Sequence, residues 1–342
     1  MALAAPFPSA QGSQVYVRGM ARALAAAGVD VTVVAYGYGE GEAGVPVVGI
    51  RVPPGYRRLR AGPDVVKPFL DFGLVAALRR LDAEVIHAHN YEALAAALLS
   101  GKPVVYNNHN LLSGELPTYF ARGRRFWARA GGWADAHLPR RADRVIAITE
   151  SAAAELRRNG CSRVTTIAPG VDPVEFSDVR PRRLGPEPTL VYAGNPDAYQ
   201  NLGILARAMV HLPDWRLLIV TATSFEFPGA TVIVTSTWRE TRDWVAGGDV
   251  AVLPRSLVGG FPLKLLNSLG LGVPTVVTTP LSQGLFGEIV VAPDDPLALA
   301  GGVRTAFAAQ MDRATIAQHT LQNCSWAQRA DEIRKVYASL AQ

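Results

Sequence analysis

The sequence has no long hydrophobic run and only two cysteines among its 342 residues. A membrane-spanning helix needs roughly 18 or more consecutive apolar residues, so a transmembrane span is excluded. Cys161 and Cys324 lack the spacing of a metal site, and we expect two reduced thiols in a cytoplasmic protein; a disulfide between them is the alternative. Residues 1–14 lack a basic segment, so no signal peptide is expected.

Signatures of nucleic-acid-binding modules are also missing, although the net charge is +5 and the isoelectric point is near 9.3. A basic protein attracts anions, and without such signatures nucleoside diphosphates and anionic lipid surfaces are better candidates than nucleic acid. No G-x-G-x-x-G motif is present at the first loop, which argues against a dinucleotide-dependent oxidoreductase. The 49% hydrophobic and 18% charged residues are typical of a well-packed globular protein.

Short β-branched runs alternate with helical segments along the chain. The runs are apolar on both faces, and this alternation predicts doubly wound α/β architecture with parallel sheets. The proline-rich segment 177–188 predicts an exposed linker between two Rossmann-like domains, 1–176 and 189–324, with the active site in a cleft between them. The predicted strands are 30–35, 84–88, 103–107, 144–149 and 163–168 in the first domain, and 189–194, 216–221, 230–235, 249–254 and 274–278 in the second.

The first of three loop-to-helix junctions lies within Pro6–Leu24. We expect Gly12 to allow a tight turn there and Ser13 to cap the following helix. Unshielded amides at the helix start would attract a phosphate or the polar end of an acceptor, whereas a simple turn is the alternative. The predicted buried face of this helix consists of Val17, Met20, Ala21 and Leu24.

The second junction, Val252–Thr278, carries the strongest signal. A buried strand leads into a loop with Gly259 and Gly260, and Pro262 suits the first position of the next helix. Exposed amides and the helix dipole favour an anion, and Lys264 adds a full positive charge, so we expect a diphosphate here. An ordinary strand–helix unit with a solvated lysine is the alternative. The predicted packed face of the helix is Leu265, Leu266 and Leu269.

The third junction, Ile167–Phe176, closes the last strand of the first domain. Gly170 permits close approach of another backbone, and Asp172 can cap or hinge the turn. On physical grounds alone this segment is a turn.

Five segments in order resemble the glycosyltransferase family 4 group of retaining GT-B enzymes. That family has an N-terminal glycine loop, a D-V-x-H-x-H strand, a histidine after the next strand, an N-G-V-D…F boundary and an E-G-F-G-L…E-A…G-x-P-V-V nucleotide helix. Each motif is weak alone, but all five occur in order, and the resemblance runs from Pro6 to about Ala338. The matching segments are PFPSAQGSQ, EVIHAHNY, VVYNNHN, PGVDPVEF and GGFPLKLLNSLGLGVPTVV, and SWAQRADEIRKVYASL resembles the family's closing helix.

The resemblance implies a GT-B fold and transfer of a sugar from a nucleotide sugar with its anomeric configuration retained. The closing helix, 325–342, would pack back on the first domain. The acceptor hydroxyl would attack beside the departing diphosphate without an enzyme nucleophile, metal or cofactor, so the protein must stabilise the leaving group. His109 matches the family's active-site histidine near the donor sugar, and a buried structural histidine is the alternative.

The chain departs from the family's pattern at the donor site. The family's paired glutamates align with Gly259 and Asn267, which assigns the chain to a subset without them. The family's diphosphate-binding arginine and lysine align with Asn195 and Gln200. With nearby cations as substitutes, the expected donor-binding residues are Gly12, Ser13, Asn195, Gln200, Arg255, Gly259, Gly260, Phe261, Lys264 and Asn267.

His89 and Asn90 are the expected acceptor contacts, with a structural role as the alternative. We interpret His87 and His89 as pointing to opposite faces of their strand, so that only one reaches the cleft. Two basic segments, 56–62 and 119–141, also stand out. The second mixes arginines with aromatic residues, which suits the headgroup zone of an anionic bilayer, and a solvated helical face is the alternative.

Together these patterns predict a retaining hexosyltransferase that uses a nucleotide sugar and an acceptor on a lipid or lipid-linked substrate. We expect it in the cytoplasm, with peripheral attachment to the inner face of the membrane. Two alternatives remain open. The first is a sugar-nucleotide-binding protein that has lost catalysis with its glutamate pair, and the second is a sugar-nucleotide epimerase of the same fold.

Overall fold

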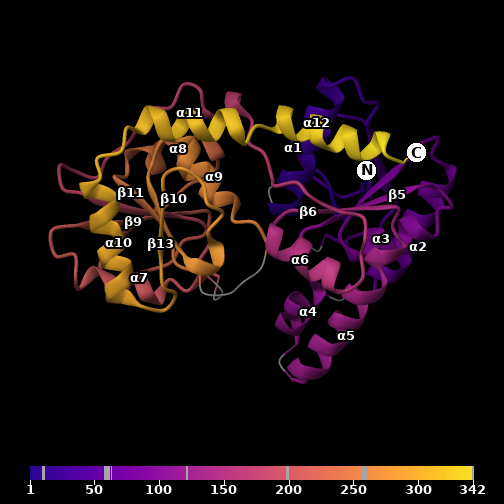
Figure 1. Ribbon diagram of the computed structural model, residues 1–342, viewed down its shortest axis with the longest axis horizontal. Coiled ribbons are helices and arrows are strands. Elements are labelled where there is room, and N and C mark those ends of the chain that lie inside the picture. Colours follow the sequence, from indigo (N-terminus) through magenta and orange to yellow (C-terminus); the bar gives the residue numbers. More distant parts are fainter. Residues whose placement is uncertain are drawn as a thin grey trace. The chain divides into compact units, whose positions relative to one another are not determined.

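The computed structural model describes residues 1–9, 12–57, 62, 64–120, 122–197, 200–255 and 260–340, and it divides into two compact units. The first unit comprises Met1–Gly170 and Trp326–Gln342 with the short segment Gly259–Phe261, and the second comprises Val171–Val258 and Pro262–Ser325. The first unit is therefore discontinuous in sequence (Figure 1). The divisions fall at Gly170 and Ser325, where the sequence pattern predicts 176 and 324.

The first unit is built on a seven-stranded parallel sheet of order β3-β2-β1-β4-β5-β6-β7. The strand order reverses between β1 and β4, and such a switch point leaves a crevice outside the carboxyl ends of the two strands. The strands are β1 (Ala2–Pro6), β2 (Val33–Tyr36), β3 (Val47–Ile50), β4 (Ile86–His89), β5 (Val104–Asn108), β6 (Arg144–Ala147) and β7 (Val164–Thr166). The helices are α1 (Gly12–Ala26), α2 (Lys67–Arg80), α3 (Tyr91–Leu98), α4 (Leu112–Glu115), α5 (Arg124–His137), α6 (Glu150–Arg158) and α12 (Trp326–Ala338).

The C-terminal helix α12 packs against α1 within this unit, and Figure 1 shows the yellow helix beside the indigo one. Glycine makes this approach possible at two positions. A Cβ atom on Gly19 would overlap the ring of Trp326, and one on Gly170 would lie 2.7 Å from the Trp326 backbone, so the expected close approach at Gly170 is confirmed. On α1, the predicted buried face is also confirmed at Val17, Met20, Ala21 and Leu24.

The second unit is built on a six-stranded parallel sheet of order β10-β9-β8-β11-β12-β13, which reverses between β8 and β11. Its switch point therefore lies beyond the carboxyl ends of β8 and β11. The strands are β8 (Thr189–Ala193), β9 (Arg216–Thr221), β10 (Ala230–Val234), β11 (Val250–Leu253), β12 (Thr275–Thr278) and β13 (Glu288–Val291). The helices are α7 (Gly203–Met209), α8 (Trp238–Gly247), α9 (Leu263–Gly270), α10 (Pro296–Ala308) and α11 (Arg313–Asn323).

The proline-rich segment 177–188 is anchored to the second unit. The backbone amides of Arg180 and Arg182 donate to the Asp243 carboxylate at 3.1 Å and to the Asp243 carbonyl at 2.8 Å. A Cβ atom on Gly247 of α8 would overlap the carbonyl of Arg182. Although many of its residues are exposed, this segment is held along α8.

The predicted fold class is confirmed, since both sheets are parallel and doubly wound. Each of the ten predicted strands is present within a few residues of its expected bounds. The sequence pattern missed β1, which is rich in alanine, and the edge strands β3 and β13, which are only four residues long and largely accessible to solvent. In the described part of the chain, no helix is both long and apolar enough to cross a membrane.

Candidate functional site

Three histidines gather near the switch point of the first sheet. His87 and His89 lie on β4, and His109 follows β5, the next strand of the sheet. The rings of His87 and His89 stack with their centroids 4.5 Å apart, so the expectation of opposite faces is wrong. Residues two apart on a strand point to the same side, and only neighbours in sequence point to opposite sides.

Hydrogen bonds and ring contacts tie this cluster together. His89 Nδ1 lies 3.3 Å from His109 Nε2, and His87 Nδ1 lies 2.7 Å from the hydroxyl of Tyr337 on α12. The Tyr16 ring stands edge-on to His109 at 4.7 Å. Among the described residues, Nε2 of His87 and Nε2 of His89 have no hydrogen-bond partner, which leaves each ring one polar edge for water or a ligand.

Burial keeps the histidine cluster neutral. It lowers the pKa of His109 to about 4 and that of His87 to about 3, and it lowers the pKa of His89 well below its usual value. In a neutral pair only one of the two facing nitrogens carries a hydrogen, so His89 and His109 fix each other's tautomer. The cluster can therefore present an oriented, uncharged imidazole at the end of β5.

These low pKa values predict that acid destabilises the fold. The unfolded chain protonates its histidines near pH 6.5, whereas the folded chain holds His87 and His109 neutral down to about pH 4. Between these pH values the unfolded state binds more protons, so the free energy of unfolding should fall as pH is lowered, by about 1.4 kcal/mol per pH unit and histidine. Urea denaturation at several pH values measures this slope.

His87→Gln tests the origin of the acid sensitivity, because glutamine keeps a polar group but takes up no proton. We expect a shallower pH dependence than in the wild type, whatever the stability at pH 7. His137→Gln on the exposed face of α5 is the matched control and should leave the slope unchanged. Equal slopes for His87→Gln and the wild type would contradict the assignment.

The other predicted residues of the first unit have mainly local roles here. Asn90 has a φ angle of 108° and caps α3, its side chain accepting from the Ala93 amide at 2.9 Å. Ser13 lies inside α1 and donates to Gln14 at 2.7 Å, so the predicted Ser13 cap is wrong. Gly12 is the first residue of the helix, and a side chain there would meet open space; the two residues before it, where the tight turn is expected, lie outside the described residues.

Lys264 defines a second candidate centre, at the switch point of the second sheet. It is the second residue of α9, which follows β11, and its ammonium donates to the hydroxyl of Tyr192 on β8 at 2.9 Å. The same ammonium lies 4.7 Å from the centre of the Tyr192 ring. The predicted packed face of α9 is confirmed, since Leu265, Leu266 and Leu269 are buried.

Burial lowers the pKa of Lys264 to about 8. The negative charge of Asp197 raises this pKa and the positive charge of Arg255 lowers it, so both groups act on the ammonium. The carbonyl of Arg255 accepts a hydrogen bond from the Thr278 hydroxyl, which fixes the backbone after β11. Two cations and one carboxylate thus lie around the carboxyl ends of β8 and β11, where α/β sheets bind anionic ligands.

Of the remaining donor-site predictions, Asn195, Gln200 and Asn267 lie in the second unit with this centre, whereas Gly260 and Phe261 belong to the first unit. Asn195 follows β8 and its carbonyl accepts from Tyr192 at 3.1 Å, whereas Gln200 is buried and its amide donates to the Asp197 carbonyl at 2.8 Å. Asn267 is half-buried on α9, one turn after Lys264. Gly260 has a φ angle of 62°, which favours glycine, and Phe261 is half-buried. Gly259 lies outside the described residues.

Sequence reasoning missed Tyr192, His87 and Tyr337. The signal for His87 was its two-residue spacing from His89, which the incorrect face assignment hid. Tyr192 sits within an apolar strand sequence and looks like a core residue until α9 is in place. In the described part of the chain, no group of histidine, cysteine and acidic residues has the arrangement of a metal site.

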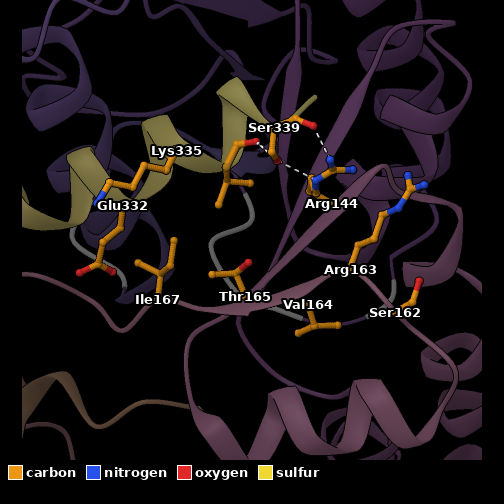
Figure 2. Close-up of a pocket in the computed structure, with 10 residues that line it drawn as sticks. Arg144, Ser162, Arg163, Val164, Thr165, Ile167, Glu332, Lys335 and Ser339 are labelled. Carbon is orange, nitrogen blue, oxygen red and sulfur yellow. Dashed lines mark hydrogen bonds between the residues drawn. The ribbon is translucent and has the colours of Figure 1, made fainter. Parts of the chain in front are cut away.

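A pocket of about 560 Å³ lies between the edge strand β7 and α12 (Figure 2). Arg144, Arg163 and Lys335 line it, but Figure 2 shows that Arg144 is joined to Ser339 of the last turn, where it donates to the hydroxyl at 2.8 Å. None of the predicted site residues lines this pocket. We therefore assign the functional centres to the two switch points.

Comparison with known proteins agrees with this architecture. Residues 10–175 match the family described as Glycosyltransferase Family 4, and residues 187–313 match the one described as Glycosyl transferases group 1. No curated protein matches the sequence.

Solved structures share the fold over nearly the whole chain. A sucrose-phosphate synthase from Thermosynechococcus elongatus is 18% identical with a TM-score of 0.80, covering 99% of this chain and 98% of its own. HepE from Anabaena in complex with UDP-glucose is 14% identical with a TM-score of 0.72, covering 99% and 98%. An α,α-trehalose 6-phosphate synthase from Burkholderia multivorans is 11% identical with a TM-score of 0.75, covering 99% and 96%.

Two Rossmann-like units in tandem, each with its candidate centre at the switch point, define a GT-B protein. The two family matches account for both units in sequence order. The chain therefore belongs to the GT-B glycosyltransferases, in glycosyltransferase family 4.

Proposed function

We propose that the protein is a retaining hexosyltransferase that transfers a sugar from a nucleoside-diphosphate sugar to an acceptor hydroxyl. The observation that carries this proposal is the half-buried ammonium of Lys264 at the switch point of the second sheet, beside Arg255. A diphosphate is the anion that such a centre suits, because charge-assisted hydrogen bonds to it are strong in a partly desolvated site. The complex of HepE with UDP-glucose supports a nucleotide sugar as the donor.

The proposed reaction breaks the bond between the anomeric carbon and the diphosphate oxygen while the acceptor oxygen bonds to that carbon from the same face. The acceptor proton passes to the departing diphosphate. Lys264 and Arg255 stabilise the charge on the leaving group, so the proposal requires no metal or cofactor in that role. His109, neutral and oriented by His89, stabilises the developing charge on the sugar.

A thermal-shift panel of UDP, ADP and GDP, followed by turnover assays with the matching nucleotide sugars, tests the proposal. We expect one nucleotide family to raise the melting temperature and its sugar to be transferred or hydrolysed. Binding without turnover would favour the impaired binding protein, for which the missing glutamate at Gly259 is the supporting observation. Conversion of the donor into a second nucleotide sugar would instead identify an epimerase.

For the acceptor, we propose a lipid or lipid-linked substrate at an anionic membrane surface. Phe120 and Trp127 stack on each other at 3.8 Å, whereas Phe126 and Trp133 are 65% and 62% exposed. One face of the α5 region therefore combines cationic and aromatic side chains at three- and four-residue spacing, as interfacial helices do. This α5 face consists of the exposed side chains of the helix, Arg124, Arg125, Phe126, Arg129, Trp133 and His137.

The α5 face predicts binding to anionic but not zwitterionic vesicles at low salt. Each arginine near such a surface contributes about 1 kcal/mol, and this attraction is screened by salt. Reversing the exposed charges at Arg124 and Arg125 should abolish co-sedimentation and leave nucleotide affinity unchanged. Reversal at Arg157 and Arg158 of α6 changes the net charge equally and should retain binding. If the wild type ignores anionic vesicles at low salt, the acceptor is a small soluble molecule.

A further inference from the structure

Lys264 has an unusual environment for a half-buried cation. Among the described residues no ion pair includes it, and its ammonium donates to the neutral hydroxyl of Tyr192. A partly desolvated ammonium with a neutral partner gains strongly from an added anion, because a charged acceptor forms the stronger hydrogen bond.

Tyr192 is built to accept from this ammonium. Its side chain is fully buried in β8, and its hydroxyl donates to the Asn195 carbonyl at 3.1 Å. Since the single hydroxyl hydrogen is used on Asn195, a lone pair of the oxygen faces Lys264. The resulting chain of two hydrogen bonds, from Lys264 to Tyr192 to Asn195, fixes the ammonium over the end of β8.

Gly194 provides the space for this arrangement. It follows β8 directly, has a φ angle of 141°, and a Cβ atom there would overlap Lys264 Nζ. Any larger residue at 194 would therefore displace the ammonium as well as strain the backbone.

From these contacts we propose that Tyr192 is a positioning residue that holds the ammonium of Lys264 for the diphosphate of the donor. The proposal rests on the proposed function of the Lys264 centre and adds the residue that orders it. In this chain Lys264, ordered by Tyr192, and Arg255 are the cations of the proposed donor site.

The arrangement has a measurable consequence for protons. Burial holds the pKa of Lys264 at about 8, with the Asp197 carboxylate raising it and Arg255 lowering it, and Tyr192 is the neutral group in contact. A bound diphosphate favours the charged ammonium and raises this pKa. At pH 9 the free lysine is mostly neutral, so binding should take up a proton, whereas at pH 6.5 it should take up almost none.

Calorimetry in buffers of different ionisation enthalpy measures this proton uptake. The probes are inorganic pyrophosphate, which needs no base pocket, and whichever of UDP, ADP and GDP binds the wild type. Tyr192→Phe keeps the ring and removes the accepting oxygen. We expect roughly 5- to 10-fold weaker binding at pH 7, within the range for loss of one ordinary hydrogen bond, because Tyr192 acts on the diphosphate only through Lys264. In Tyr192→Phe, proton uptake on binding should begin at a lower pH than in the wild type. The charged form of Lys264 loses the oxygen that accepts its hydrogen bond, so the pKa of the free lysine falls.

Tyr36→Phe on β2 is the matched control, since it also removes the hydroxyl of a fully buried tyrosine, which there donates to Asp71 at 2.6 Å. It should change neither affinity nor proton uptake. Gly194→Ala is the second variant and should weaken binding at least as much as Tyr192→Phe. Circular dichroism confirms that each variant is folded.

The outcomes separate the two levels of the proposal. If the wild type binds and folded Tyr192→Phe binds with the same affinity and the same proton uptake, Tyr192 does not have the proposed role. The donor site would then still stand. If Lys264→Ala also binds normally, the donor site itself is wrong. If no nucleoside diphosphate or pyrophosphate binds the wild type, both the proposed function and the role of Tyr192 fail.

Discussion

Lys264→Ala should weaken nucleoside-diphosphate binding by about 1.5–3 kcal/mol, the range for hydrogen bonds to charged groups. The ammonium lies at the carboxyl end of β8, and no other lysine takes part in this centre among the described residues. Its loss would leave the diphosphate to Arg255 and the backbone amides. Isothermal titration calorimetry at pH 7 measures the change, because Lys264 is mostly charged there.

Lys335→Ala is the control for this experiment. Lys335 is exposed on α12 and lines the pocket of Figure 2. Its replacement by alanine removes the same positive charge as Lys264→Ala. We expect no change in nucleotide affinity. A loss with Lys335→Ala and none with Lys264→Ala would move the donor to that pocket and refute the assignment.

His109→Ala should reduce donor turnover about 100- to 1000-fold, as expected when one stabilising group of the transition state is removed. Nucleotide affinity should change by less than about threefold, because the proposed role of His109 is exerted on the sugar. Steady-state kinetics together with calorimetry separates the two effects. Since its pKa is about 4, the rate should show no titration of this imidazole between pH 6 and 9.

His319→Ala on the exposed side of α11 is the matched control and should change neither donor turnover nor nucleotide affinity. His89→Ala should resemble His109→Ala in a milder form, because His89 orients the ring and does not touch the sugar in the proposal. Parallel losses of turnover and nucleotide affinity in His109→Ala would make it a structural residue instead.

The sequence was sufficient for the architecture because strands that are buried on both faces have a conspicuous composition. Val252 and its neighbours on β11 could be recognised in this way, and the helix face of Leu265, Leu266 and Leu269 follows from spacing alone. The edge strands β3 and β13 could not be recognised in this way, since much of their surface is accessible to solvent. The alanine-rich β1 lies at the centre of the first sheet, and only its neighbours make it a strand.

The candidate site was predicted less completely, for reasons that particular residues show. Lys264 was found because a cation after a glycine loop is visible in sequence. Its partner Tyr192 precedes it by 72 positions, and no local pattern joins the two. For His87 the sequence itself is sufficient, because residues two apart on a strand, such as His87 and His89, point to the same face. Ser13 looked like a helix cap, but the helix begins one residue before it.

The position of α12 has a consequence for synthesis on the ribosome. The core around α1 includes Trp326, Ile333 and Val336 of α12, and a chain made from its N-terminus lacks these residues until the second unit has been translated. During that interval the second unit, which is interrupted in sequence only by residues 259–261, has already emerged and can fold. The nascent first unit must wait with part of its apolar surface uncovered until α12 has been translated.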